Sequence, residues 1–241
     1  MKALGVIPAR IGATRFPAKP LALLRGRPLV LHVLDRAREC AALDRVVVAT
    51  DAAEIARIVT EDGGDAMLTR EDHASGTDRV AEVAERLPEY GAVVNLQGDE
   101  PTLDPRAIAA AVEPILRGEA KMATLAHRES DLEAFASPDV VKVLVGADGF
   151  ATDFTREPAA AAMTGGSFLR HVGLYAFERA TLLRFASLEP TERERAKRLE
   201  QLRALDHGIN IRVVLTPWRS RGVDTPADLA ELESSGQEPL R

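Results

Sequence analysis

Three short stretches of the chain are apolar at consecutive positions rather than at alternate ones. They lie at residues 3–8, 45–50 and 92–96, and β-branched side chains are frequent in them. Continuous runs of this kind are typical of strands that are buried on both faces of a parallel sheet. The pattern therefore predicts three central strands of one sheet.

Amphipathic stretches lie between and after these strands, and two of them begin with recognisable capping signals. Asp51 with Glu54 three residues later resembles a capping box, and Asp104-Pro105 places an N-cap before a first-turn proline. Helices are predicted at 29–39, 52–61, 78–87 and 106–116. The alternation of strands and helices predicts an α/β fold with a doubly wound, mostly parallel sheet.

The pattern changes after residue 116. Strands are predicted at 122–128, 140–145, 168–177 and 211–215, one helix from a capping box at Thr191 and Glu194 to 207–208, and a last helix from Pro226. We expect a single domain over residues 1–241, with an α+β insertion at about 120–210 that closes over the site as a lid. Two independent domains are the alternative.

Composition narrows the class of protein. The 241 residues carry a formal net charge of −6 and one cysteine, Cys40, which has no partner for an internal disulfide or a zinc site, as is typical of a reducing cytoplasm. The acidic balance argues against a nucleic-acid partner. No run approaches the roughly 20 apolar residues that cross a bilayer, and the first residues lack the cleavage site of a signal peptide. We expect a cytoplasmic enzyme without a nucleic-acid or membrane partner.

The loop after the first predicted strand, within residues 7–21, gathers cations. Arg10, Arg15 and Lys19 are combined there with a flexible Gly12 and two prolines. Open α/β sheets bind ligands at this edge, and a triphosphate needs several converging cations. The loop fits neither the Walker A motif nor the G-x-G-x-x-G fingerprint. It therefore favours triphosphate binding over the alternative, a solvated basic loop.

Two acidic residues lie at positions where they could face that triphosphate. Asp99 follows the strand at 92–96, and Asp224 precedes the N-cap Thr225 and the first-turn Pro226. Mg²⁺ in proteins takes one or two carboxylates together with substrate phosphates. The alternatives are a turn role for Asp99 and a helix-dipole role for Asp224. Together with the cationic loop, the pair predicts a magnesium site.

Seven short motifs occur in order between about residues 4 and 229. They are I-P-A-R-I-G-A-T-R-F-P-A-K-P-L (7–21), V-A-T-D (48–51), H-A-S-G-T-D-R (73–79), V-N-L-Q-G-D-E-P (94–101), L-R-H-V-G-L-Y (169–175), L-E-Q-L-R-A-L (199–205) and G-V-D-T-P-A-D-L (222–229). With these motifs the chain resembles the 3-deoxy-manno-octulosonate cytidylyltransferase (CMP-Kdo synthetase) family. The resemblance implies a fold like that of nucleotide-diphospho-sugar transferases, a homodimer, and an insertion that serves as sugar-side lid and dimerisation region.

The same resemblance implies a reaction. CTP and 3-deoxy-D-manno-octulosonate (Kdo) would give CMP-Kdo and pyrophosphate, with Mg²⁺ as cofactor, in the synthesis of lipopolysaccharide or surface-polysaccharide precursors. The sugar hydroxyl at C2 would attack the α-phosphorus in line, while two magnesium ions assist, one on the triphosphate and one at the attacking hydroxyl. The resemblance assigns no general base.

Residues on the nucleotide side follow from the motifs. Asp99, Asp224, Lys19 and Arg10 are implied as catalytic, and the two aspartates as the metal ligands. Nucleotide binding is implied for Pro8, Ala9, Arg10, Arg15, Lys19, Ser75, Gly76 and Thr77. The last three would lie near the cytosine, where a compact pocket of hydroxyl and backbone groups suits a pyrimidine. They could also serve as a loop and the N-cap of the following helix.

Residues on the sugar side would come from the insertion and the strand before it. The resemblance implies Gln97, Arg156, His171, Tyr175, Glu200 and Gln201. An anionic polyol needs a cation for its carboxylate and neutral or acidic groups for its hydroxyls. The alternative for Glu200 and Gln201 is a solvated helix surface, and for His171 a strand residue without a ligand.

One segment departs from the pattern of the family. Residues 157–166 read E-P-A-A-A-A-M-T-G-G, shorter and poorer in polar groups than expected. Alanine and glycine side chains give a sugar no hydrogen bonds, so a different acidic ulosonate, such as 8-amino-Kdo or a sialic-acid-like sugar, is an alternative substrate. An alternative of another class is a non-catalytic nucleotide sensor, which would need neither Asp99 nor Asp224 near the phosphates.

Overall fold

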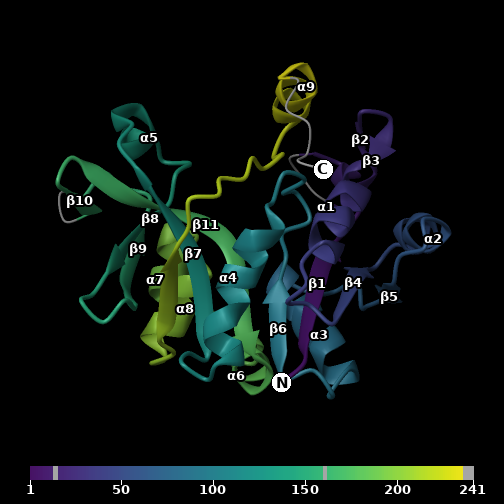
Figure 1. The fold of residues 1–241 in the computed structure, drawn as a ribbon, viewed down its shortest axis with the longest axis horizontal. Coiled ribbons are helices and arrows are strands. Elements are labelled where there is room, and N and C mark those ends of the chain that lie inside the picture. The colour runs from purple at the N-terminus through teal and green to yellow at the C-terminus, as the bar shows by residue number, and fades with distance from the viewer. Residues whose placement is uncertain (13–15, 160–161, 236–241) are drawn as a thin grey trace.

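A computed structural model describes residues 1–12, 16–159 and 162–235. In these ranges ten strands form one sheet, whose main path runs β12-β7-β11-β6-β1-β4-β5 (Figure 1). The strands of this path are β1 (Ala3–Ala9), β4 (Arg45–Thr50), β5 (Ala66–Leu68), β6 (Ala92–Asn95), β7 (Met122–Glu129), β11 (Ser167–Glu178) and β12 (Ile211–Leu215). All neighbours on the path are parallel except β11, which is antiparallel to β6 and β7. The predicted mostly parallel sheet is therefore confirmed.

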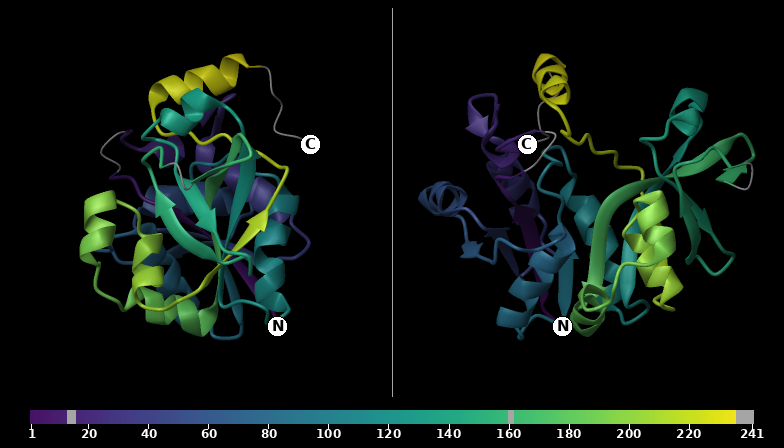
Figure 2. Two further views of the ribbon diagram at one scale, coloured as in Figure 1. Left: turned by 90° about the vertical axis from the view of Figure 1, so that its left-hand side faces the viewer. Right: turned by 180° about the vertical axis from the view of Figure 1, so that it is seen from behind.

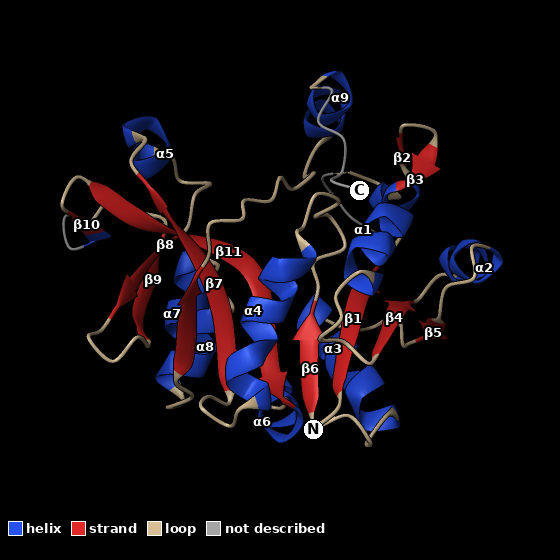
Figure 3. Ribbon diagram, in the orientation of Figure 1, coloured by secondary structure: helices blue, strands red, loops and turns tan. Residues whose placement is uncertain are grey.

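Helices cover both faces of the sheet (Figures 2 and 3). One apolar core lies under α1 (Leu29–Arg38), α2 (Ala53–Glu61) and α4 (Pro105–Leu116). The other lies under α3 (Gly76–Arg86), α6 (Arg179–Ala186) and α8 (Gln201–Asp206). Strand β1 contributes Ile7 to the first core and Val6 to the second, because successive side chains of a strand point to opposite faces. This arrangement confirms the doubly wound fold.

The predicted insertion is partly built into the sheet. Its residues form β7 and β11 of the main path, while other elements, including three strands of the same sheet, lie off that path on one side (Figure 1). These are α5 (Leu132–Ala136), β8 (Lys142–Val145), β9 (Ala151–Thr155) and β10 (Met163–Thr164). Gly165 and Gly166 both have positive φ angles of 58° and 75° and join β10 to β11. A two-residue hairpin turn with positive φ at both positions favours glycine, which adopts these angles without strain, and this explains the glycine pair. Closure of this region as a lid stays a prediction.

Capping signals were reliable at three helix starts and wrong at one. Thr191 caps α7 (Glu192–Lys197) in a capping box with Glu194, and Thr225 caps α9 (Pro226–Ser234). Asp104 caps α4 by accepting a hydrogen bond from the Arg106 N–H. Asp51 does not cap α2. The N-cap there is Ala52, without a side-chain hydrogen bond, because the Asp51 carboxylate is paired with the buried Arg79 at 2.8 Å.

The helix predicted from Thr191 to residues 207–208 is divided in two. Helix α7 ends at Lys197, Arg198 adopts a left-handed conformation with φ of 52°, and α8 begins at Gln201. The two short helices are held together by a buried ion pair, in which Arg203 Nη2 lies 2.6 Å from Glu194 Oε1. A left-handed residue other than glycine costs about 1–2 kcal/mol, so tertiary contacts must offset this cost. Helical periodicity alone could not reveal the break.

The smaller elements complete the fold around the site. They are η1 (Lys19–Leu21), β2 (Leu23–Leu24) and β3 (Arg27–Pro28). Among the described residues no helix has the length and apolar character needed to cross a membrane.

Replacing Asp104 by Ala tests the cap of α4. The carboxylate accepts hydrogen bonds from the Arg106 backbone and side chain, which hold its pKa below the usual value. We expect a loss of about 1 kcal/mol in the free energy of unfolding at pH 7. Because the folded-state pKa is lowered, this stabilisation is present above the unfolded pKa and is lost as the pH falls through the folded one. Urea unfolding at pH 7 and at a pH well below the usual value of 3.8 measures the free energy of unfolding of the natural protein and of Asp104→Ala. The difference between them should narrow in acid, while Asp104→Ser should retain most of the cap. Equal losses at both pH values would show that the charge does not contribute.

Candidate functional site

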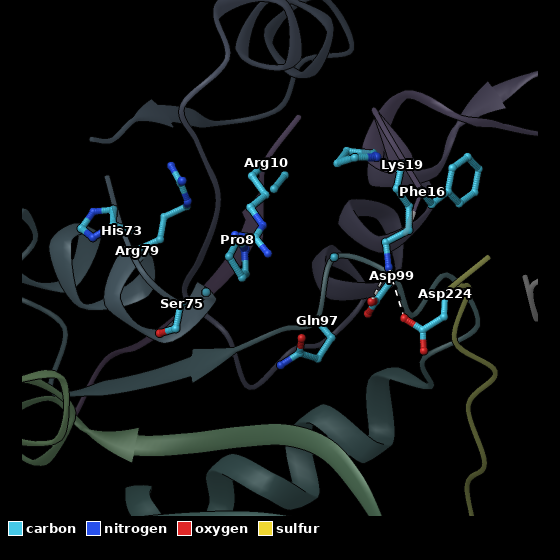
Figure 4. Close-up of a pocket in the computed structure, with 14 residues that line it drawn as sticks. Pro8, Arg10, Phe16, Lys19, His73, Ser75, Arg79, Gln97, Asp99 and Asp224 are labelled. Carbon is cyan, nitrogen blue, oxygen red and sulfur yellow. Dashed lines mark hydrogen bonds and ion pairs between the residues drawn. The ribbon is translucent and has the colours of Figure 1, made fainter. Parts of the chain in front are cut away.

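A cavity of about 290 Å³ opens where the carboxyl ends of β1 and β6 meet the segment before α9. Figure 4 shows Lys19, Asp99 and Asp224 at one end of it. His73, Ser75 and Arg79 lie at the other end. Pockets at this edge of an open α/β sheet are the usual ligand sites of the fold.

Lys19 joins the two aspartates that the sequence placed far apart. Its Nζ lies 2.6 Å from Asp99 Oδ2 and 3.7 Å from Asp224 Oδ1. The same nitrogen donates a hydrogen bond of 2.9 Å to the Val223 carbonyl oxygen. Lys19 of the cationic loop and both acids therefore face one space, while the binding of phosphate and metal there stays a prediction.

Backbone contacts fix the distance between the two acidic segments. The Val223 N–H donates a 2.8 Å hydrogen bond to the Asp99 carbonyl oxygen. Gly98 lies so close to β1 that a Cβ atom there would be 2.7 Å from the Pro8 carbonyl oxygen. A glycine is needed where backbones approach this closely. The loop after β6 is thus held against both the loop after β1 and the start of α9.

Asp99 and Asp224 form a donor set that suits Mg²⁺. Two carboxylates face the cavity, and the Lys19 ammonium lies between them, so a cation already fits that space. The described residues contain no group of three or more His, Cys, Asp or Glu side chains that could hold a metal. A hard cation would therefore need ligands from a substrate, as Mg²⁺ in nucleotide enzymes does.

Glu100 follows the cavity residue Asp99 and carries a perturbed carboxyl that the sequence analysis missed. Burial raises the pKa of its carboxyl to about 7, and the charges of Asp99 and Asp224 act in the same direction, against a hydrogen bond from Ser220. Its Oε2 is buried without a hydrogen-bond partner. The only signal was its place beside Asp99 in the run G-D-E-P, which does not reveal burial. Perturbed carboxyls of this kind cluster at functional sites.

The remaining predicted phosphate contacts are partly described. Pro8, Ala9 and Arg10 line the cavity, and Figure 4 shows Arg10 near its middle. Arg15 lies outside the described residues. Other lining residues were not predicted: Phe16, Pro20, His73, Arg79 and Gly98.

Ser75 and Gly76 line the cavity at the start of α3. Ser75 is the N-cap, and its hydroxyl accepts from the Asp78 N–H in a capping box, so the predicted capping role is confirmed. Thr77 is placed differently. Its side chain is buried, and its hydroxyl points to Glu200 rather than lining the cavity.

Arg79 lies at the same end of the cavity as His73 and Ser75 and is almost fully buried. It pairs with Asp51 at 2.8 Å and donates to the Thr69 hydroxyl and the Arg70 carbonyl oxygen. These contacts tie α3 to the ends of β4 and β5. Sequence analysis missed this role, because the three contacts depend on tertiary packing and no local motif reveals them.

Of the predicted sugar residues, Gln97 alone lines this cavity among the described residues. It lies beside a bulge in β11, where the pairing register shifts between Val172 and Tyr175. A Cβ atom on Gly173, within the bulge, would be 3.9 Å from Gln97 Cγ. Bulges are frequent next to functional sites, where they redirect side chains.

His171 and Tyr175 form an aromatic pair on β11, with ring centroids 5.5 Å apart. His171 Nε2 lies 2.9 Å from the Thr124 hydroxyl, which can donate in turn to the Leu174 carbonyl oxygen at 2.8 Å. Burial lowers the pKa of His171 to about 3, and the charge of Arg156 acts in the same direction. The histidine is therefore a neutral hydrogen-bonding group.

Arg156 is engaged by the backbone of the loop before β8. It donates to the carbonyl oxygens of Pro138 and Asp139. The fully buried Lys142 donates to the carbonyl oxygens of Ser137 and Arg156, both at 2.8 Å. The predicted cation for the sugar carboxylate is thus part of a clamp that fixes residues 137–139.

Glu200 and Gln201 lie at the break between α7 and α8. Gln201 is buried, and Glu200 accepts a hydrogen bond from Thr77 at 2.6 Å. Gln201 thus differs from the solvated helix surface considered as the alternative, whereas the Glu200 side chain keeps 32% of its surface exposed.

Comparisons with known proteins cover nearly the whole chain. Residues 4–211 match the family described as cytidylyltransferase. The 3-deoxy-manno-octulosonate cytidylyltransferase of Syntrophobacter fumaroxidans is 47% identical over 236 residues, which are 95% of this chain and 94% of that protein. The protein of the same name from Nitratidesulfovibrio vulgaris strain Hildenborough is 48% identical over 93% of this chain and 92% of its own.

A solved structure agrees with these relatives. It is described as CMP:2-keto-3-deoxy-manno-octonic acid synthetase complexed with CTP, and it is 40% identical in sequence. The match has a TM-score of 0.91 and covers 98% of both chains. This chain therefore belongs to the 3-deoxy-manno-octulosonate cytidylyltransferase family and is a nucleotidyltransferase.

Proposed function

We propose that this protein is a Mg²⁺-dependent cytidylyltransferase that transfers the CMP part of CTP to Kdo and releases pyrophosphate. The observation that carries the proposal is the contact of Lys19 with both Asp99 and Asp224 at one end of the cavity. The names of the relatives and the CTP complex of a related structure support the choice of substrates. A nucleotide sensor would have no need for this arrangement of charges.

In the proposed reaction the C2 hydroxyl of the sugar attacks the α-phosphorus of CTP in line, and pyrophosphate leaves. Arg10 and Lys19 hold the phosphates and stabilise the negative charge on the leaving group. Asp99 and Asp224 would hold Mg²⁺, which when bound would supply further neutralisation and lower the pKa of the attacking hydroxyl. Gln97, between the two ends of the cavity, would orient the sugar. The protein acts mainly by positioning the two substrates.

The test is an assay of pyrophosphate release. Each of CTP, UTP, ATP and GTP is combined with Kdo, 8-amino-Kdo or a sialic-acid-like sugar, with Mg²⁺ or with EDTA. We expect CTP with Kdo to give the highest kcat/KM, and EDTA to abolish release. Comparable rates with a purine triphosphate, or full activity in EDTA, would refute the proposal.

A different acidic ulosonate is the second candidate substrate. It is favoured by residues 157–166, whose described part includes a glycine turn that offers a sugar no side-chain hydrogen bond. The assay above separates the candidates, because it compares the sugars on one enzyme. A kcat/KM that is highest for a sugar other than Kdo would support the alternative.

We extend the proposal to the setting of the enzyme, as a cytoplasmic homodimer that supplies lipopolysaccharide or surface-polysaccharide precursors. Cys40 is buried and unpaired, as suits a reducing compartment. Sedimentation equilibrium would measure the mass in solution, and a mass of 26.0 kDa, that of one chain, would contradict the dimer.

A further inference from the structure

A hydrogen bond links the first turn of α3, beside the cavity, to the residue that precedes α8. The Thr77 hydroxyl lies 2.6 Å from Glu200 Oε2, across 123 positions of the chain. Thr77 is only 4% exposed, whereas the Glu200 side chain keeps 32% of its surface exposed. Its neighbours Ser75 and Gly76 line the cavity, whereas Glu200 belongs to the predicted sugar residues.

The direction of the Thr77 hydroxyl is fixed by a second contact. Asn95 at the end of β6 donates from Nδ2 to Thr77 Oγ1 at 3.2 Å. Because the Asn95 side-chain nitrogen can only donate, the Thr77 oxygen accepts from it, and the Thr77 hydroxyl proton is donated to the Glu200 carboxylate. Hydrogen bonds to a charged group are stronger than those between neutral groups. The orientation of Glu200 therefore depends on the position of Thr77.

Glu200 keeps one oxygen without a hydrogen bond. Its Oε1 is buried and has no hydrogen-bond partner. Arg203 Nη2 lies 3.9 Å from this oxygen and pairs more closely with Glu194 Oε1, at 2.6 Å. A buried acceptor left unpaired costs free energy that a ligand hydroxyl would recover. Burial raises the pKa of the Tyr175 hydroxyl, and the negative charge of the nearby Glu200 raises it further.

We propose that Thr77 is a positioning residue that couples the binding of the two substrates. A base seated against Ser75 and Gly76 fixes the start of α3, and with it the Thr77 hydroxyl. This holds Glu200 with Oε1 available to a hydroxyl of the sugar. Coupling is reciprocal, so the sugar must strengthen nucleotide binding by the same factor. The inference rests on the proposed function, because it needs a nucleotide and a sugar as co-substrates.

The test compares Thr77→Val, which keeps the shape without the hydroxyl, with Thr77→Ser, which keeps the hydroxyl. Calorimetry gives the Kd of the α,β-methylene analogue of CTP, which cannot release pyrophosphate, with Mg²⁺. Each titration is repeated with a saturating amount of the ulosonate that the release assay selects. We expect the sugar to tighten binding roughly tenfold in the natural protein and less than about twofold in Thr77→Val, with Thr77→Ser close to the natural value.

The outcomes separate this inference from the proposed function. Coupling in Thr77→Val equal to that of the natural protein would overturn the inference, even if both Kd values were weaker. Absence of coupling in a natural protein that turns over CTP and the sugar would overturn it as well. Absence of turnover with every ulosonate would instead refute the proposed function. Should Thr77→Val fail to fold by circular dichroism, Glu200→Gln replaces it, and undiminished coupling there would count against the inference.

Discussion

Replacement of Asp99 by Asn is expected to lower turnover by about a thousandfold, because one of the two proposed metal ligands is lost. The amide keeps the size of the side chain but removes the charge that pairs with Lys19 at 2.6 Å. CTP binding without Mg²⁺ should change little, since the phosphates then depend on Arg10 and Lys19 rather than on a carboxylate. Pyrophosphate release measures the first effect, and calorimetry with CTP in EDTA the second.

A matched control is Glu113→Gln, which removes an exposed carboxylate paired with Arg117 on α4. This variant should keep its activity, since surface ion pairs contribute little. Asp224→Asn should behave as Asp99→Asn does. The double variant should be hardly worse than either single one, since both aspartates are proposed to hold the same cofactor. Turnover of Asp99→Asn within tenfold of the natural protein would contradict the metal role.

The sequence predicted most of the fold because its strands are continuous apolar runs. The predicted bounds of β4 and β12 agree with the structure, Arg45–Thr50 and Ile211–Leu215. Strand β5 was not located, since it has only three residues and none of them is buried. Helix ends were harder to predict, because a side chain that could cap a helix can instead bind another partner. Asp51 looked like a cap in sequence, but its carboxylate is needed by the buried Arg79.

The candidate site could be predicted as far as topology determines it. Parallel strands end at the same edge, so loops after β1 and β6 had to converge, and the structure brings Lys19 to Asp99 and Asp224. Contacts that depend on tertiary packing could not be predicted, because no sequence motif marks them. The Thr77–Glu200 hydrogen bond requires the left-handed turn at Arg198, which no periodicity shows. The environment of Glu100 likewise depends on a segment far away in the chain, where Ser220 forms a hydrogen bond with its carboxyl and Gly222 lies close to it.

Lys19 has two roles that a single substitution should separate. Its ammonium keeps two carboxylates together in the absence of a metal, and in the proposed reaction it also holds the phosphates. Lys19→Met retains the length of the stem and removes the charge. Turnover should fall by about a hundredfold or more, because the leaving group loses a cation. Stability without Mg²⁺ should also fall, by about 1–2 kcal/mol, since Asp99 and Asp224 then repel each other without compensation.

Mg²⁺ should reverse the loss of stability but not the loss of turnover. In the natural protein the ammonium competes with a metal for the two carboxylates, so Mg²⁺ without nucleotide should raise Tm only slightly. In Lys19→Met that competitor is gone, and the rise in Tm on adding Mg²⁺ should be larger. Thermal unfolding with Mg²⁺ or with EDTA measures the change in Tm of the natural protein and of Lys19→Met. The matched control is Lys121→Met, because Lys121 is exposed and lies outside the cavity. Equal responses of Lys19→Met and the natural protein to Mg²⁺ would show that Lys19 does not occupy the place of a metal.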